Sequence, residues 1–269
     1  MIEQQQSETA TESGEESGEG LPTKDGFAGV SRSAVGIAEL FGGVLVALGA
    51  SVVGVVVLSI IDPSVTDANA DDQSDGAALG LQAFAVLGFV LAPFAMTMLA
   101  NRGGLADAAR RLGLSRVPRR LLSTIAIAIP VYLLIAGLIA GLLEPNQDDI
   151  AESLGADENA SLGIKIAAGV LIIGGAAIGE ELFFRGLIFG GLRQRLSLWP
   201  AALISAVLFG LPHLPQGDLA VVLQLSVLGV ILAWAYERSG ALWAPIALHG
   251  LNNTLAFLVL IDVINLGGL

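Results

Sequence analysis

The chain of 269 residues contains no cysteine, only two lysines and only two histidines, and charged residues make up just 14% of it. Without cysteine it can form no disulfide, no thiolate nucleophile and no Cys-ligated metal site. A soluble domain carries roughly 25% charged residues, so the low charged fraction argues against a soluble protein. The formal net charge of −12 argues against nucleic acid as a partner.

Apolar residues, by contrast, make up 54% of the chain, and they gather in seven runs. The approximate limits of the runs are 34–61, 78–100, 121–143, 162–190, 198–212, 219–236 and 241–263. A helix that crosses ~30 Å of hydrocarbon needs about 20 residues. Five runs meet this length, the sixth is close, and the fifth in order is short and ends at two prolines. Runs this long are not the alternating strands of a barrel. We therefore predict an all-α fold, a polytopic transmembrane bundle of about seven to eight helices.

The acidic residues are segregated from the apolar runs. Eighteen of the 25 acids lie in three polar segments, 3–25, 62–75 and 144–158. Residues 1–33 have almost nothing to bury, so we expect a disordered acidic tail. We expect transmembrane helices over 34–143 and a transmembrane core with the candidate site over 144–269. The acidic, lysine-poor loops are typical of proteins from salt-adapted (halophilic) organisms.

Arginines predict the orientation in the membrane. The segment 101–120 contains six of them, and Arg193, Arg195 and Arg238 lie in two later turns. The acidic segments between the other runs contain no lysine or arginine. Because basic loops stay on the cytoplasmic side, we expect a multi-pass protein of the cell membrane with a cytoplasmic N-terminus.

Few ionisable residues lie inside the apolar runs: Glu39, Lys165, Glu180, Glu181, Arg185, His213, His249 and Asp262. A charge at the bilayer centre costs at least ~2.5–3.5 kcal/mol, so such side chains face a bundle interior or a wet cavity. Lys165 and Asp262 are near run ends, where they can reach the interface. The remaining residues are candidates for a site.

Helix geometry separates the two neighbouring glutamates. Glu181 and Arg185 are four residues apart, share a helix face and can form an ion pair. Glu180 is about 100° further round the helix and has no cation in reach on its own helix. An isolated carboxylate in a low-dielectric site readily accepts a proton, as a general base must.

Both histidines lie in or at the end of apolar runs. His213 follows Phe209 by four residues on one face, and Asn253 follows His249 in the same way. An intramembrane histidine or asparagine by itself more often packs or links helices. However, Glu180 and His213 both lie roughly 25 Å along their helices from the turn between them. We therefore predict that these residues converge at one pocket.

Three stretches resemble, in order, the motifs of the CPBP family, also called the Abi family. They are "EELFFR" (Glu180 to Arg185), "FGLPH" (Phe209 to His213) and "HGLNN" (His249 to Asn253). The family includes CAAX prenyl endopeptidases and bacteriocin-processing or immunity-associated proteins. The resemblance covers roughly 160–260 and implies an intramembrane endopeptidase whose cavity opens toward the cytosol. Its substrate would be a membrane-anchored or lipidated polypeptide, such as a prenylated CAAX protein.

The resemblance also implies roles for these residues. Glu180 and His213 would activate a water molecule, and His249 and Asn253 would hydrogen-bond the developing oxyanion. The supporting residues would be Glu181, Arg185 and Phe209.

Alternatives remain open. A two-histidine, one-carboxylate zinc site could form from Glu180, His213 and His249, although there is no H-E-x-x-H motif; we favour a mechanism without a metal or other cofactor. A non-catalytic membrane scaffold or immunity protein of the same family is a second reading. A proton-coupled transporter is a third, but we find no inverted repeat to support it.

Overall fold

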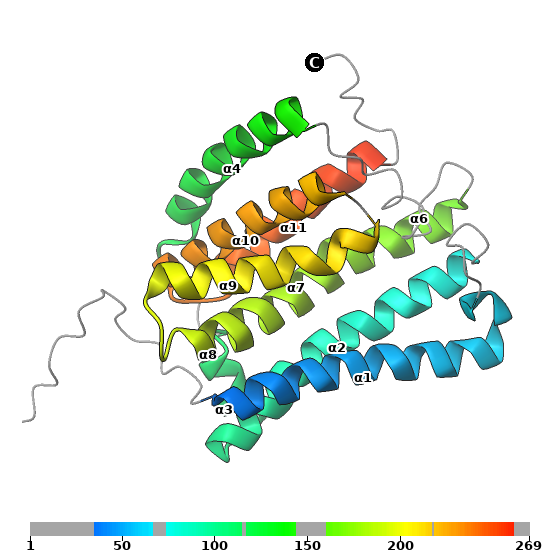
Figure 1. Cartoon of the computed structure of the whole chain (residues 1–269), viewed down its shortest axis with the longest axis horizontal. Coiled ribbons are helices and arrows are strands. Elements are labelled where there is room, and N and C mark those ends of the chain that lie inside the picture. The colour runs from blue at the N-terminus through cyan, green and yellow to red at the C-terminus, as the bar shows by residue number, and fades with distance from the viewer. Residues whose placement is uncertain (1–34, 67–73, 115–116, 144–159, 217, 261–269) are drawn as a thin grey trace, which may run out of the picture.

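All regular structure in the described part of the chain is helical, in agreement with the predicted all-α class. The computed structural model describes residues 35–66, 74–114, 117–143, 160–216 and 218–260 (Figure 1). The predicted tail, residues 1–33, and the acidic segment 144–158 lie outside these ranges.

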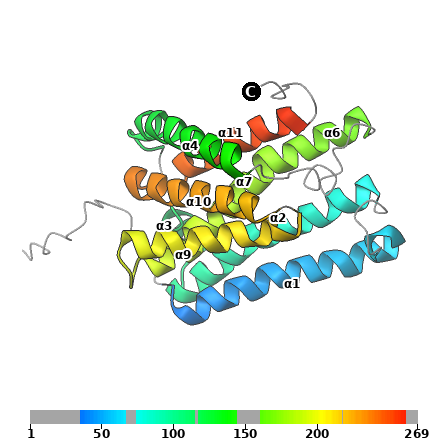
Figure 2. The ribbon, with the colours of Figure 1, turned by 45° about the horizontal axis from the view of Figure 1, so that its top comes forward.

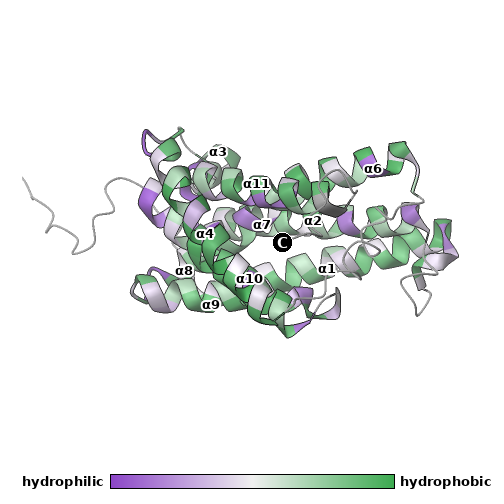
Figure 3. Cartoon of the chain, turned by 90° about the horizontal axis from the view of Figure 1, so that it is seen from above, coloured by the Kyte–Doolittle hydropathy of each residue, from purple (hydrophilic) through white to green (hydrophobic). Residues whose placement is uncertain are grey.

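Six helices in these ranges are long and apolar enough to cross a membrane. They are α1 (Ile37–Ile61), α2 (Asp75–Asn101), α4 (Leu121–Leu143), the continuous helix Leu162–Leu192, the helix Leu198–Pro215 and α10 (Leu219–Ser239). The seventh predicted run forms α11 (Trp243–Leu260). Large apolar side chains such as Leu45 and Ile60, 70% and 80% exposed, cover the outside, and much of the helical ribbon has the green colour of hydrophobic residues (Figure 3). Such a surface suits contact with lipid chains rather than water.

Two of these helices change their winding along their length. The helix Leu162–Leu192 consists of α6 (Leu162–Gly169), η3 (Val170–Ala176), α7 (Ala177–Glu180), η4 (Glu181–Phe189) and α8 (Gly190–Leu192). Its segments η3 and η4 have the wider turns of a π-helix. The other consists of α9 (Leu198–Gly210) and the 3₁₀ turns of η5 (Leu211–Gln216). The prolines that shorten the fifth apolar run therefore tighten its last turns without ending the helix.

The helices form a bundle with the helix Leu162–Leu192 at its centre. That helix packs against α2 on one side and against α9 and α11 on others. The helices α1 and α2 lie side by side, and α4 covers α10 and α11 from outside (Figures 1 and 2). This arrangement surrounds the helix that carries Glu180, Glu181 and Arg185 with apolar helices.

A short helix, α3 (Leu105–Arg111), lies in a segment that we had treated as a loop. Its Asp107 accepts hydrogen bonds from Arg110 and Arg111, three and four residues later, a spacing that supports a helix. These bonds also lower the pKa of Asp107 below its usual range, with the bond from Arg111 the largest cause.

The arginine-bearing turns gather at one end of the bundle. Arg193 pairs with Glu237 at 2.7 Å, and the guanidinium of Arg195 donates to the Val35 carbonyl at 3.4 Å. The Leu242 amide donates to the carbonyl of Gly113 at 2.9 Å. These bonds connect the start of α1, the turn after α3 and the ends of α8 and α10. The predicted topology requires these arginine-bearing turns to lie at the same end of the bundle. The side of the membrane that this end faces stays a prediction.

Glu39 has a structural role. Its carboxylate accepts a hydrogen bond of 2.7 Å from the Gly36 amide at the first turn of α1. An acid at this position caps the helix and interacts favourably with its dipole.

Glycines let the helices approach closely. A Cβ atom on Gly179 would lie 3.2 Å from the Val86 carbonyl oxygen in α2, and one on Gly88 would lie 2.9 Å from the Ala47 carbonyl oxygen in α1. The small residues before Glu180 thus bring α7 against α2, as expected for small-residue helix contacts.

We predict that Gly88→Ala separates α1 from α2, because the added methyl group meets backbone rather than a side chain that can turn away. The free energy of unfolding should fall by ~1–3 kcal/mol, as in other overpacked cores. Thermal unfolding in detergent measures this. The matched control is Gly137→Ala in α4, where a Cβ would have nothing within 4 Å; equal melting temperatures for the two variants would contradict the prediction.

Candidate active site

The two glutamates lie where the central helix changes its winding. Glu180 is the last residue of α7 and Glu181 the first of η4. At the end of η4 the Gly190 amide donates to the carbonyl of Arg185, five residues earlier. π-Turns are rare and often occur at functional sites, because the wider spiral redirects the side chains that it carries.

The predicted ion pair is confirmed. Glu181 Oε1 lies 2.8 Å from Arg185 Nη1, and both side chains are completely buried. Arg185 also donates from Nη2 to the Gly229 carbonyl of α10 at 3.3 Å, and its guanidinium carbon lies 4.3 Å from the ring centre of Phe209 in α9. The pair therefore connects three elements in the interior of the bundle.

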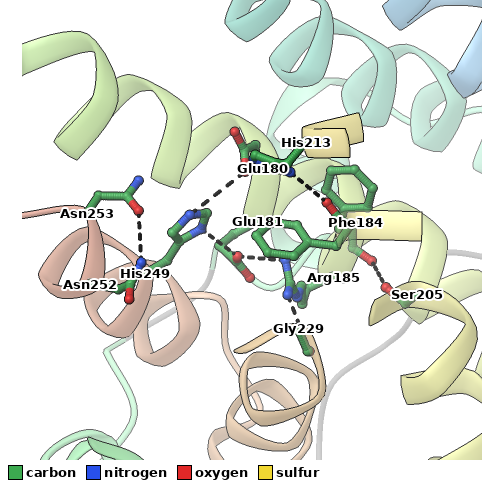
Figure 4. Close-up of polar contacts among 11 residues, drawn as sticks. Glu180, Glu181, Phe184, Arg185, Ser205, His213, Gly229, His249, Asn252 and Asn253 are labelled. Carbon is green, nitrogen blue, oxygen red and sulfur yellow. Dashed lines mark hydrogen bonds and ion pairs between the residues drawn. The ribbon is translucent and has the colours of Figure 1, made fainter. Parts of the chain in front are cut away.

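His249 of α11 contacts both glutamates. Its Nδ1 lies 2.9 Å from Glu181 Oε1, and its Nε2 lies 3.8 Å from Glu180 Oε2 (Figure 4). The two carboxylates point about 100° apart round their helix, and that spacing does not predict that one imidazole reaches both with its opposite nitrogens. Only the position of α11 brings this about.

The two glutamates differ in their access to solvent. The Glu181 side chain is fully buried, whereas 12% of the Glu180 side chain is exposed. Among the described residues, Glu180 makes its one ion-pair contact with His249. It is thus the carboxylate of this cluster that a water molecule or a substrate can approach.

His213 lies beside the cluster but makes no polar contact with it among the described residues. Its Nδ1 is 3.2 Å from the Phe209 carbonyl oxygen, and since a carbonyl only accepts, Nδ1 is the donor. The ring of Phe209 touches both histidines, with centroid distances of 5.8 Å to His213 and 5.5 Å to His249. Phe209 therefore packs against both imidazoles.

Asn253 connects helices. Its Nδ2 donates to the carbonyl of Ile172 in η3 at 3.0 Å, and its Oδ1 accepts from Asn252 at 3.3 Å. An amide nitrogen carries two hydrogens, so the bond to Ile172 leaves one for a further acceptor.

The zinc alternative does not fit this arrangement. No three His, Asp or Glu side chains converge as a metal-binding group in the part of the chain that the structure describes. The Nδ1 atoms of both histidines are bonded elsewhere, in His213 to a backbone carbonyl and in His249 to Glu181, which leaves Nε2 of each ring. Because Glu180, His213 and His249 do not form a metal-binding group, we derive no step through a metal.

The comparisons with known proteins concern this same region. Residues 162–255 match the family model described as Type II CAAX prenyl endopeptidase Rce1-like. This segment is an Rce1-like domain. All three motifs of the sequence analysis lie within the domain, which confirms the family resemblance.

Two relatives are similar to parts of the chain. Over 99 residues it is 33% identical to the "Putative membrane peptidase YdiL" of Bacillus subtilis (strain 168), covering 36% of this chain and 39% of that protein. Over 85 residues it is 35% identical to an "Uncharacterized 24.3 kDa protein" of Escherichia coli, covering 31% of this chain and 39% of that protein. The chain thus spans about two fifths of the length of these relatives. No solved structure matches it, and the comparisons do not support the halophilic interpretation.

We predict that Arg185→Met strongly destabilises the protein, because it leaves the Glu181 carboxylate buried without a cation. Breaking a buried pair in this way costs about 3–5 kcal/mol. The control is Arg110→Met, which removes an exposed arginine from its pair with Asp107 and should cost about 1 kcal/mol or less. Detergent unfolding curves of the two variants give the comparison; a drop no larger for Arg185→Met than for Arg110→Met would contradict the role of the buried pair.

Proposed function

We propose that the protein is an intramembrane endopeptidase that hydrolyses a membrane-anchored or lipidated polypeptide, with Glu180 as the general base. The observation that carries the proposal is the Glu180–Glu181–His249 cluster. A partly exposed carboxylate lies beside an imidazole, and a buried pair of opposite charges supports that imidazole from behind.

In the proposed reaction Glu180 takes a proton from a water molecule, and the water oxygen attacks the carbon of the scissile peptide bond. The carbonyl oxygen becomes an oxyanion, which accepts hydrogen bonds from His249 Nε2 and from the second N–H of Asn253. The C–N bond then breaks, and the proton taken up by Glu180 passes to the leaving amine. His213, whose ring packs against Phe209 as that of His249 does, is proposed to orient the water.

The position inside a candidate membrane span favours this chemistry. Donors aimed at a developing oxyanion act more strongly where little water competes for it. Both glutamates of the cluster lie on the helix Leu162–Leu192, which is long and apolar enough to cross a membrane. A substrate that is itself held at the membrane by a lipid or by an apolar segment can present its peptide bond at this depth. The family description, a CAAX prenyl endopeptidase, supports a prenylated C-terminus as the first substrate to test.

The first test is Glu180→Gln, which keeps the shape of the side chain but removes the proton acceptor. Cleavage of a lipidated C-terminal peptide should fall at least a hundredfold, since general-base catalysis contributes about 10²–10⁴-fold, while folding and membrane insertion remain. The control is Glu39→Gln, which lies in α1 and whose amide oxygen can still accept from the Gly36 amide. Full cleavage by Glu180→Gln would rule out the proposed base. Solute flux in proteoliposomes without any cleavage would instead favour a transporter. If the Glu180→Gln variant keeps its full activity in cells, a scaffold would be favoured.

A second test addresses the nucleophile. Because the donor set for zinc is not assembled, we expect a chelator to leave the cleavage rate unchanged. Elemental analysis of the purified protein should accompany this measurement. Stoichiometric zinc whose removal abolishes cleavage and whose return restores it would contradict the metal-free mechanism.

A further inference from the structure

We infer that Glu181 is a positioning residue that fixes the tautomer of His249, with the proton always on Nδ1 and with Nε2 directed at Glu180. This inference concerns one hydrogen bond within the site, and its catalytic meaning rests on the proposed function. The contact is short, 2.9 Å from His249 Nδ1 to Glu181 Oε1, and both side chains are buried.

The direction of that hydrogen bond follows from the ion pair. Arg185 Nη1 donates to the same oxygen, Oε1, at 2.8 Å, and the two side chains form a buried ion pair. An ionised carboxylate only accepts hydrogen bonds, so Nδ1 of His249 must be the donor. In the neutral imidazole the other nitrogen, Nε2, then has a lone pair and no proton. It becomes a donor only when the ring takes up a second proton.

The charges of the cluster connect this second proton to Glu180. Glu181 and Arg185 cancel each other, which leaves Glu180 and His249 beside a neutral pair. A buried net charge is costly, so Glu180 and His249 are favoured either both neutral or both charged; the 3.8 Å between Nε2 and Oε2 is an ion-pair distance and not a hydrogen bond. Around His249, no other described acid or base makes a hydrogen bond or an ion pair with the ring; its neighbour from α9 is the ring of Phe209.

This balance of charges explains how Glu180 and His249 can supply both the base that activates water and the donor that stabilises the oxyanion. When the proton is on His249, Glu180 is an ionised base that can accept a proton from water, and Nε2–H is a donor for the oxyanion. In the opposite tautomer, protonated on Nε2 alone, the neutral ring could donate to the oxyanion whether or not Glu180 is ionised. Glu181 therefore couples the state of the base to the state of the donor.

A second observation indicates that Glu181 is not placed for stability alone. Its Oε1 accepts from both Arg185 and His249, while its other oxygen, Oε2, is buried and has no hydrogen-bond partner among the residues that the structure describes. A buried acceptor left unsatisfied is destabilising. Such arrangements are expected where a side chain is held for a function rather than for packing.

The test uses the small number of histidines. The full-length protein carrying His213→Gln, with a purification tag that contains no histidine, has His249 as its one imidazole and can be labelled with ¹⁵N-histidine. Nitrogen NMR then reports directly which ring nitrogen carries a proton. We expect Nδ1 of His249 to be protonated at every pH at which the protein is folded, whereas Nε2 can be protonated or unprotonated. A bare Nδ1 with a protonated Nε2 would overturn the inference.

A pair of double variants separates positioning from structure. In Glu181→Leu with Arg185→Leu, removed together so that no lone charge stays buried, the Nδ1-protonated population should fall and kcat should drop at least tenfold with KM nearly unchanged. The control removes another ion pair, with Arg193→Leu and Glu237→Leu, and should leave the His249 spectrum unchanged. An unchanged His249 spectrum in the Glu181 double variant would overturn the inference. If that variant does not fold, the spectrum of the protein with Glu181 intact decides alone.

The two proposals fail in different ways. The nitrogen spectrum requires no substrate, so the tautomer assignment is tested even if no peptide is cleaved. An active Glu180→Gln variant with Nδ1 of His249 protonated would reject the endopeptidase mechanism and keep the role of Glu181.

Discussion

The buried ion pair between Glu181 and Arg185 is the interaction on which the rest of the site depends. Charges are tolerated inside a membrane bundle only when they are paired and hydrogen-bonded. Here the carboxylate accepts from Arg185 and His249, and the guanidinium also donates to the Gly229 carbonyl. The pair thereby connects the central helix to α10 and α11 without exposing either charge to lipid.

The fold supplies what this pair requires. Small residues allow close helix contacts around it: Gly179 brings the central helix against α2, and Gly229 lies where a side chain would collide with Ala206 of α9. The absence of a side chain at Gly229 keeps α9 and α10 close, and its carbonyl is an acceptor for Arg185. Phe209 covers the guanidinium from the side of α9. The apolar packing and the polar site therefore depend on each other, because each close contact between helices also determines where a hydrogen-bond donor or acceptor lies.

Much of the fold could be predicted from composition and spacing because the bilayer restricts the choices. With no water to satisfy backbone groups, a long apolar run must be helical, and the runs agree with the helices within a few residues. The short helix α3 was missed because its signal is polar: one acid with two arginines at helical spacing in a segment rich in glycine. The proline-broken fifth run also became longer than expected, since 3₁₀ turns extend the helix past Pro212.

The site was predictable in part. By itself the sequence determined the membrane-spanning helices, the Glu181–Arg185 pair and the few polar residues that needed partners. These features could be predicted because helical spacing and the cost of burying a charge both act within one segment of the chain. Only the tertiary structure decided which of those partners meet. It placed His249 beside two carboxylates and His213 against the ring and backbone carbonyl of Phe209. Contacts between segments depend on the depth, rotation and tilt at which separate helices pack, and no periodicity within a single helix encodes those.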